Sequence, residues 1–232
     1  MRQVRRKLQS EEASAPGGRL SDLAYDRILE RLFDRTLPAG AFVSQSQLVE
    51  LLGVPVAPLR DALRVLEAEG IVTIQPRSGI QFVKPGLELT KSTYQFRTMI
   101  ERAAVRVFAE AGDDEQIEEI ERQHLEFVAR LEQAGGLDQQ TLDGLEELET
   151  LLHDSVIGIL RNPLIETTYH RMHNYLRLVR LDRKLTVPLA LKGLREHMAI
   201  IRAVKARDPD AAEAALVAHF GAALQRHLGM FL

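Results

Sequence analysis

Residues 51–72 read LLGVPVAPLRDALRVLEAEGIV, and this stretch decides the fold of the N-terminal part of the chain. Gly53 ends one short helix, and Pro55 opens the next, where its missing amide hydrogen costs little. Apolar residues then recur at helical spacing until Gly70, and Ile71 begins a β-rich run. The stretch therefore predicts two helices separated by a tight turn and followed by a strand.

The flanking residues complete this pattern. Upstream, an amphipathic helix from Leu20 ends at LPAG (37–40), and Ser44 opens the short helix of the pair. Downstream, residues 71–74 and 80–83 predict two strands joined by a Pro- and Gly-containing turn. Helix, helix, tight turn, helix and hairpin is the order of a winged helix-turn-helix, which places its second paired helix in the DNA major groove.

The C-terminal part, beyond KPG (84–86), predicts helices only, so the fold class is mainly α: a winged helix-turn-helix with a small β-hairpin wing, then an all-α bundle. Glycine and proline breaks separate the amphipathic segments. The expected helices span residues 90–111, 113–134, 138–161, 163–184, 187–206 and 208–230. The expected divisions are a flexible arm (1–18), a DNA-binding domain (19–84), a linker (85–89) and a helical domain (90–232).

The composition excludes several classes of protein. The chain of 232 residues has no cysteine, so disulfides and thiolate metal sites are impossible. No apolar run approaches the roughly 20 residues of a membrane helix, and no signal-peptide core follows the basic N-terminus, which predicts a cytoplasmic protein without a membrane partner. The net charge is −3. Residues 1–86 carry 12 basic and 10 acidic side chains, so charge alone does not indicate nucleic acid.

The first residues include Arg5, Arg6 and Lys7. Such a polar arm is either a tail without a role or a basic segment that touches phosphates or a minor groove. The sequence leaves both interpretations open.

Two sets of motifs carry a family resemblance. The stretch 51–72 resembles the GntR family of transcription regulators. The C-terminal half resembles the FCD ligand-binding domain of the FadR subfamily, and six helices rather than seven resemble its VanR-like branch. The motifs of that half are Phe96-Arg97 with Glu101, Glu149-xxx-His153, Asn162-Pro163-Leu164, Glu196-His197 and Ala218-His219.

This resemblance implies a homodimer that binds double-stranded operator DNA. It also implies a small organic acid as effector, whose binding changes the grip on DNA, with repression as the default. The function expected is therefore a ligand-responsive, DNA-binding regulator and not an enzyme.

Four residues form a candidate metal site. Glu149 and His153 are four residues apart and share a helix face, while His197 and His219 belong to two later helices. A lone histidine on an apolar face is usually only packed, but three at the spacing of the FCD family with a carboxylate favour a divalent ion. Zinc is the first candidate, and nickel, manganese or iron are alternatives. The family has aspartate at the position of Glu149, so the ion could be displaced or this ligand weaker.

The other histidines lack such support. We interpret His124 and His227 as surface residues, and His170 as a surface residue or a pocket residue. Candidates for effector binding are Arg97 and Glu101, one helical turn apart, which form either a plain salt bridge or a carboxylate-binding site. Three residues on the helix after Pro163 are further candidates: His173, Asn174 and Arg177. Glu146, Glu147 and the run from Glu115 to Glu121 indicate solvated faces.

The DNA-contact candidates lie on the paired helices and the wing. Arg60 and Arg64 share a face opposite the leucine stripe, where they could bind a guanine edge or a phosphate. The related motif usually has arginines where this chain has Ser46 and Val56. Their absence predicts an operator outside the family consensus and a modest affinity that falls steeply with salt. The full candidate set is Gln45, Ser46, Gln47, Ala57, Arg60, Arg64, Arg77, Ser78 and Gly79.

Two alternative functions remain open from the sequence. A metal-dependent hydrolase would need an open metal position and a general base, but no motif such as His-Glu-x-x-His is present. A regulator that responds to the metal ion itself would use the same four ligands. Release from DNA by metal alone would distinguish it from a sensor of an organic acid.

Overall fold

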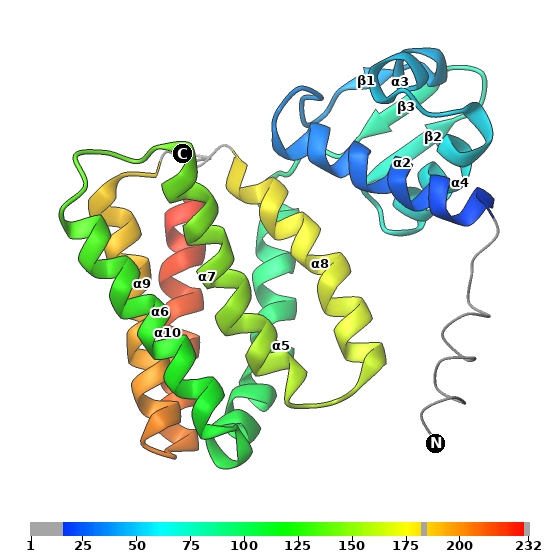
Figure 1. Ribbon diagram of the computed structural model, residues 1–232. Coiled ribbons are helices and arrows are strands. Elements are labelled where there is room, and N and C mark those ends of the chain that lie inside the picture. The colour runs from blue at the N-terminus through cyan, green and yellow to red at the C-terminus, as the bar shows by residue number, and fades with distance from the viewer. Residues whose placement is uncertain (1–15, 182–184, 230–232) are drawn as a thin grey trace, which may run out of the picture. The chain divides into compact units, whose positions relative to one another are not determined.

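The computed structural model describes residues 16–181 and 185–229. The chain forms two compact units, of which one ends at Pro85 and the other begins at Gly86 (Figure 1). The basic residues Arg5, Arg6 and Lys7 lie outside the described residues. Within the described residues, no helix is both long enough and apolar enough to span a lipid bilayer.

The described residues of the N-terminal unit form three helices. They are α2 (Pro16–Phe33), α3 (Gln45–Leu52) and α4 (Val56–Ala68). Ser44 caps α3: its hydroxyl accepts from the backbone N–H of Gln47, and the Gln47 side chain accepts from the backbone N–H of Ser44. Gly53 ends α3 in the left-handed conformation, with φ at 62°, so that α4 begins only a few residues later. The expected tight turn between paired helices is confirmed.

A three-stranded antiparallel sheet follows, formed by β1 (Phe42–Val43), β2 (Val72–Gln75) and β3 (Gly79–Phe82). The expected hairpin of β2 and β3 is confirmed. The sequence did not predict β1, which pairs with the other edge of β3 in the order β1-β3-β2. Two residues are too short to show a period-two pattern, so no local signal marks this strand.

The core of the N-terminal unit comes from the apolar stripes of its helices and from the sheet. Leu59, Leu63 and Leu66 of α4 are fully or almost fully buried. Leu48 and Leu52 of α3 are buried, whereas Leu51, at the edge of the same helix face, is 40% exposed. The stripe on α4 leaves the opposite face of that helix free for a partner.

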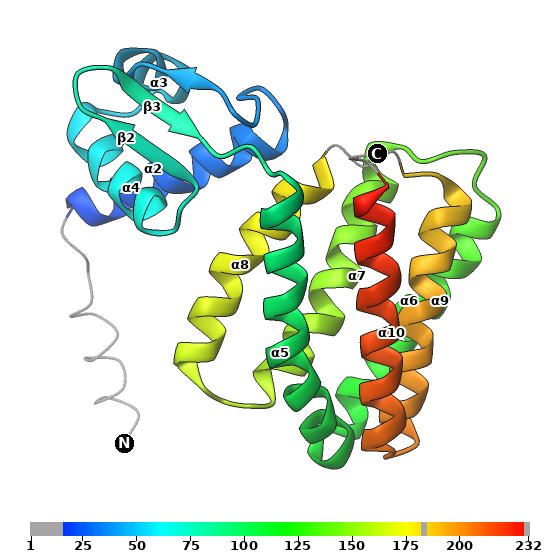
Figure 2. The same ribbon diagram turned by 180° about the vertical axis from the view of Figure 1, so that it is seen from behind.

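The described residues of the C-terminal unit form six helices, as the sequence predicts (Figure 2). Asp113, Asp138 and Asp208 each accept a backbone N–H at the start of a helix. The apolar core joins all six helices, with Val105, Leu152 and Ile200 among its buried members. The helices are α5 (Leu87–Ala111), α6 (Asp114–Glu132), α7 (Gln139–Gly158), α8 (Pro163–Leu181), α9 (Val187–Lys205) and α10 (Pro209–Leu228).

Two helices begin earlier than the sequence predicts. Helix α2 begins at Pro16, within the segment 1–18 that the sequence predicts as an arm. Helix α5 begins at Leu87, within the predicted linker 85–89, and Gly86 precedes it in an extended conformation. The sequence places the start of a helix at the first residue of its periodic apolar pattern. Both helices begin a few residues before that point.

Candidate functional site

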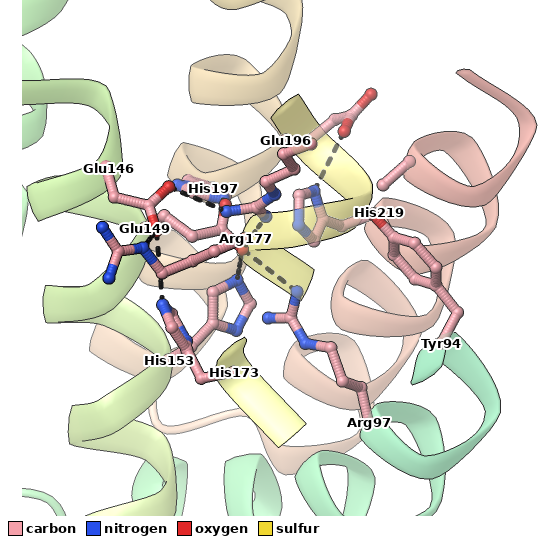
Figure 3. Close-up of polar contacts among 12 residues, drawn as sticks. Tyr94, Arg97, Glu146, Glu149, His153, His173, Arg177, Glu196, His197 and His219 are labelled. Atoms are coloured by element: carbon pink, nitrogen blue, oxygen red, sulfur yellow. Dashed lines mark hydrogen bonds and ion pairs between the residues drawn. The ribbon is translucent and has the colours of Figure 1, made fainter. Parts of the chain in front are cut away.

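Four side chains from three helices converge inside the C-terminal unit. Glu149 and His153 come from α7, His197 from α9 and His219 from α10. Each offers one ligand atom, and these atoms lie within 4.8 Å of one another (Figure 3). All four residues are buried, with exposed fractions between 0% and 8%. The structure therefore brings the four candidate ligands together.

Each of the three imidazoles directs its Nε2 atom toward the other candidate ligands. The Nε2 atoms of His153, His197 and His219 are buried and have no hydrogen-bond partner among the described residues. Two of them, in His153 and His197, lie 3.4 Å from Glu149 oxygens, but none of the three has a hydrogen bond of good geometry. Buried polar atoms are nearly always satisfied, so this cluster needs an explanation. Three imidazole nitrogens and a carboxylate oxygen suit a divalent ion such as zinc, and an ion there would satisfy all three.

The opposite ring nitrogen of each histidine is anchored. A hydrogen bond at Nδ1 fixes both the ring orientation and the tautomer, and leaves the Nε2 lone pair available to a metal. The partners come from three different helices. They are Glu101 Oε2 at 2.5 Å from His153, His124 Nε2 at 3.2 Å from His197, and Glu196 Oε2 at 2.9 Å from His219.

Burial keeps these histidines in the neutral, metal-competent form. It lowers the pKa of His153, His197 and His219, since a charged imidazolium loses its hydration in the interior. The carboxylate anchors oppose this effect in part, because Glu101 and Glu196 favour the protonated ring. The net direction is downward for all three.

Glu149 lies between the imidazoles and two arginines. Its Oε1 contacts Arg180 Nη2 at 2.5 Å and Arg97 Nη1 at 3.1 Å. Its carboxylate oxygens lie 3.4 Å from the Nε2 atoms of both His153 and His197. Burial alone would raise the pKa of Glu149, but Arg180 and then His153 hold it well below its ordinary value. The side chain is therefore an ionised oxygen ligand.

Arg97 and Glu101 form a buried pair rather than an exposed helix-surface bridge. Arg97 is 1% exposed, and its Nε donates to Glu101 Oε1 at 2.7 Å. The same oxygen accepts from Tyr169 Oη at 2.9 Å. Burial would raise the pKa of Glu101, but Arg97 and His153 lower it to about 2. Both oxygens of Glu101 are thus used within the protein, which makes it an anchor of His153 and not a group facing a ligand.

Two guanidinium nitrogens in this region remain available. Arg97 Nη2 and Arg180 Nε are buried and have no hydrogen-bond partner among the described residues. The Arg97 guanidinium also lies 4.4 Å from the centre of the Phe220 ring, which holds it in place. These two guanidinium N–H groups can donate to an acceptor such as a carboxylate oxygen.

The candidates on α8 lie beside this cluster. His173 Nε2 lies 3.3 Å from Glu146 Oε1, and Arg177 Nε lies 3.5 Å from the same oxygen. Asn174 is half-buried. Glu146 was expected on a solvated face, but it is half-buried and joins His173, Arg177 and Arg180. The expectation of a solvated face is therefore wrong for Glu146, whereas Glu147 is exposed.

Two other histidines differ from their expected positions. His124 and His227 are fully buried, so their interpretation as surface residues is wrong. Both continue the apolar stripe of their helix: Ile120 precedes His124, and Phe127 follows it at helical spacing. His170 is exposed.

The sequence missed several residues of the cluster. Arg180 carries no motif, and Tyr169 has the pattern of an ordinary core aromatic. Glu196 belongs to the Glu196-His197 motif, but its role was not inferred; it also accepts from Arg226 Nη1 and Nη2, each at 2.7 Å. The apolar stripe of α6 was the signal that could have identified His124.

The DNA-contact candidates on α4 are exposed, and one of them contacts α3. Arg60 and Arg64 are exposed on the face of α4 opposite its buried leucines. Arg60 Nε donates to Gln45 Oε1 at 3.1 Å, which joins α4 to α3, and Arg64 pairs with Asp61 at 3.4 Å. Both contacts are exposed, so a phosphate or base could replace them.

The candidates at the start of α3 are less available for contact with DNA than Arg60 and Arg64. Ser46 is exposed and lies 3.0 Å from the Ser44 hydroxyl, and Ala57 on α4 is also exposed. Gln45 is half-buried. The Gln47 side chain is exposed but is used in the cap of α3, so its amide oxygen already has a donor.

The wing tip is exposed at Arg77 and Ser78, and Arg77 has a positive φ of 66°. Gly79 has a structural role. A Cβ at this position would lie 2.7 Å from the backbone oxygen of Val43 and 3.0 Å from Phe42 Cζ. The glycine is therefore required for the approach of β1 to β3, a requirement distinct from a contact with DNA.

Comparison with known proteins identifies both units. The profile described as bacterial regulatory proteins, gntR family, matches residues 20–82, and the FCD domain profile matches residues 92–222. The uncharacterized HTH-type transcriptional regulator YdhC of Bacillus subtilis (strain 168) is 24% identical over 196 residues. That alignment covers 84% of this chain and 85% of YdhC.

Solved structures share the fold. McbR/YncC of E. coli has a TM-score of 0.73 at 15% identity, over 92% of this chain and 99% of that one. A GntR transcriptional regulator from Rhodococcus sp. RHA1 has a TM-score of 0.73 at 21% identity, over 91% and 98%. These structures show the fold, and the two profile matches show the family. The chain belongs to the GntR family of bacterial transcription regulators and carries a C-terminal FCD ligand-binding domain.

Proposed function

We propose that the protein represses transcription as a homodimer, and that a carboxylate-bearing metabolite bound beside a divalent ion in the FCD domain changes its affinity for operator DNA. GntR regulators bind operator DNA and commonly dimerise. In this proposal α4 enters the major groove, and Arg60 and Arg64 bind its base edges or phosphates. Ser46, Gln45 and the wing tip at Arg77 and Ser78 contact the backbone.

The observation that carries the metal proposal is the set of three buried, unsatisfied Nε2 atoms beside the Glu149 carboxylate. Zinc suits this donor set best, and nickel, manganese and iron suit it too. Glu149 has a longer side chain than the aspartate of the family pattern. Its carboxylate nevertheless lies 3.4 Å from two of the imidazole nitrogens, which supports it as a ligand.

The effector proposal rests on charge and on spare donors. Arg97 and Arg180 balance the charges of Glu101 and Glu149, so a bound divalent ion would add positive charge beside carboxylates that are already paired. Arg97 Nη2 and Arg180 Nε each retain an unused N–H, and an anionic carboxylate would satisfy both requirements. An ion in this position holds and polarises such a ligand. On α8, His173, Asn174 and Arg177 then line the approach.

The link to DNA is a shift in population. An effector that binds one arrangement of the dimer more tightly than another favours that arrangement, and only the difference in affinity counts. The two DNA-binding units are thereby held at a separation that fits the operator or does not.

The test combines metal analysis with DNA binding. Purified protein is treated with chelator, reloaded with zinc, and titrated against operator DNA with and without a panel of mono- and dicarboxylates. The expected result is one zinc per chain and a change in DNA affinity that needs both zinc and a carboxylate. His219→Ala removes the effect, while His170→Ala, at an exposed position on α8, keeps it.

Two outcomes would contradict the proposal. Release of DNA by zinc alone, with no effect of any carboxylate, would make the metal itself the signal. Full response of the His219→Ala protein would show that the four-residue cluster is not the regulatory site.

A further inference from the structure

The three anchors of the candidate ligands differ in kind. His153 and His219 are held by the carboxylates of Glu101 and Glu196, whereas His197 is held by an imidazole, that of His124. An ionised carboxylate can only accept a hydrogen bond, whereas an imidazole nitrogen donates or accepts depending on whether it carries the proton. The tautomer of His197 therefore depends on the state of a second histidine.

The backbone of α6 determines that state. His124 Nδ1 lies 2.8 Å from the carbonyl oxygen of Ile120, one turn earlier. A carbonyl oxygen can only accept, so Nδ1 of His124 carries a hydrogen. The residue is fully buried, and the partners given to it by the structure are this carbonyl and His197, both uncharged. A neutral His124 then presents an unprotonated Nε2 to His197.

The state of His124 in turn determines the tautomer of His197. An unprotonated His124 Nε2 accepts from His197 Nδ1 at 3.2 Å, so the ring proton of His197 lies on Nδ1. Its Nε2, which lies 3.4 Å from Glu149 Oε2 without a hydrogen bond of good geometry, then carries no proton and faces the other candidate ligands. The two rings meet edge to face with centroids 5.4 Å apart.

We propose that His124 is a positioning residue, which relays the Ile120 carbonyl to His197 and so holds His197 in the one tautomer that can bind a metal through Nε2. The inference rests on the proposed metal site for its consequence, but the tautomer itself needs no metal. It assigns α6 a role in the centre, although that helix supplies no ligand. Ligands and anchors together then come from α5, α6, α7, α9 and α10.

The alternative is that His124 only fills space in the core. Two substitutions separate these roles. In His124→Gln the amide can donate to Ile120 and accept from His197, which preserves the relay. In His124→Leu the volume is kept but both hydrogen bonds are lost. The matched control is His227→Leu, because His227 is also fully buried and also lies 2.8 Å from a carbonyl one turn earlier, that of Ala223.

The first measurement uses the full, chelator-treated protein with ¹⁵N-labelled histidine. NMR of the ring nitrogens at neutral pH should show His197 protonated at Nδ1 in the unsubstituted protein, in His124→Gln and in His227→Leu. In His124→Leu the two tautomers should mix. A His197 protonated at Nε2 in the unsubstituted protein would overturn the proposal, even if His124→Leu failed to fold.

The second measurement is zinc affinity by chelator competition. Loss of an anchor to a metal-bound histidine typically weakens binding by about 10- to 100-fold, and we expect that loss in His124→Leu. His124→Gln and His227→Leu should stay within a few-fold of the unsubstituted protein. Unchanged affinity and tautomer in His124→Leu would contradict the positioning role. If no protein bound zinc but the tautomers behaved as expected, the proposed metal site would fail and the relay would stand.

Discussion

The two units use arginine in opposite ways. Arg60 of α4 is exposed, and its one described contact is a single hydrogen bond at the surface. Arg97 of α5 is 1% exposed and is enclosed by Glu101, Glu149 and the Phe220 ring. A surface arginine is available to an external partner and contributes little to folding. The charge of a buried arginine must be neutralised within the protein interior, so residues of several surrounding helices are needed to pair with it.

This difference extends to the whole of each region. Among the DNA-contact candidates, Arg60 and Arg64 can change without disturbing the leucine core beneath them, because their side chains face away from it. In the FCD domain the candidate ligands are buried in the interior, and their anchors come from other helices. A change in DNA contact can therefore be separated from a change in stability at Arg60 and Arg64, whereas the two are coupled at the candidate ligands of the second unit.

The largest expected effect follows from Arg97→Met. It leaves Glu101 and Glu149 with less compensation in the interior, and removal of one partner of a buried ion pair costs about 3–5 kcal/mol. We expect a loss of this size in the free energy of unfolding, measured by chemical denaturation of the metal-free protein. A loss below about 1 kcal/mol would show that the buried network is not needed for folding.

A second substitution sharpens the same point. Glu101→Gln added to Arg97→Met removes the uncompensated carboxylate but keeps a group that can bond Tyr169 and His153. The double variant should recover part of the lost stability. Glu119→Ala, which breaks an exposed contact to Arg122, should cost under about 1 kcal/mol and serves as the control.

Acid should separate the two units. All seven histidines lie in the FCD domain, and burial lowers the pKa of His124 to about 4 and that of His153, His197 and His219 in the same direction. Their folded pKa lies below the unfolded value of 6.5, so the unfolded chain binds protons first. The stability they contribute is present above pH 6.5 and is lost as the pH falls toward 4.

Hydrogen exchange of the full metal-free chain, read by mass spectrometry and corrected for intrinsic rates, follows both units at once. Between pH 6.5 and 4.5 the peptides of the FCD domain should lose protection. The peptides of residues 20–82 should keep theirs, since that segment holds no histidine. A parallel loss in both units would contradict this origin of the acid sensitivity.

Two glycines give a smaller, opposed pair of effects. Gly79→Ala places a Cβ 2.7 Å from the Val43 oxygen at a φ of 153°, which should cost about 1–3 kcal/mol and loosen the wing. Gly221→Ala in α10 meets no atom within 4 Å and should stabilise that helix by about 0.5–1 kcal/mol. Thermal unfolding measures both, and a stabilised Gly79→Ala protein would contradict the described contact of β1 with β3.

The helices could be predicted from the sequence because their signals are local. Spacing alone places Glu149 and His153 on one helix face, but the addition of His197 and His219 rested on the resemblance of their motifs to the FCD family. The anchors could not be predicted in this way. Glu101 reaches His153 across 52 positions and His124 reaches His197 across 73, so these contacts depend on how the helices pack.

Burial was misjudged for a related reason. A histidine or a charged residue is assigned to the surface by default, and Arg97, His124 and Glu146 all depart from that default inside one network. The default holds where charges meet water, as for Arg60 and Arg64. It fails where charges of opposite sign from different helices neutralise one another, which no single segment reveals.

The smallest expected effect on stability follows from Arg60→Ala. Its exposed contact to Gln45 should change the free energy of unfolding by under about 0.5 kcal/mol. DNA affinity should nevertheless fall by about 1–3 kcal/mol if Arg60 reads a base, with relaxed preference at one operator position. If it binds a phosphate, the loss is uniform across sequences and the salt slope decreases by about one. Arg195→Ala, at an exposed site of the FCD domain, should change neither quantity. Equal DNA affinities of the two variants would remove Arg60 from the recognition surface and, with it, the contrast to Arg97.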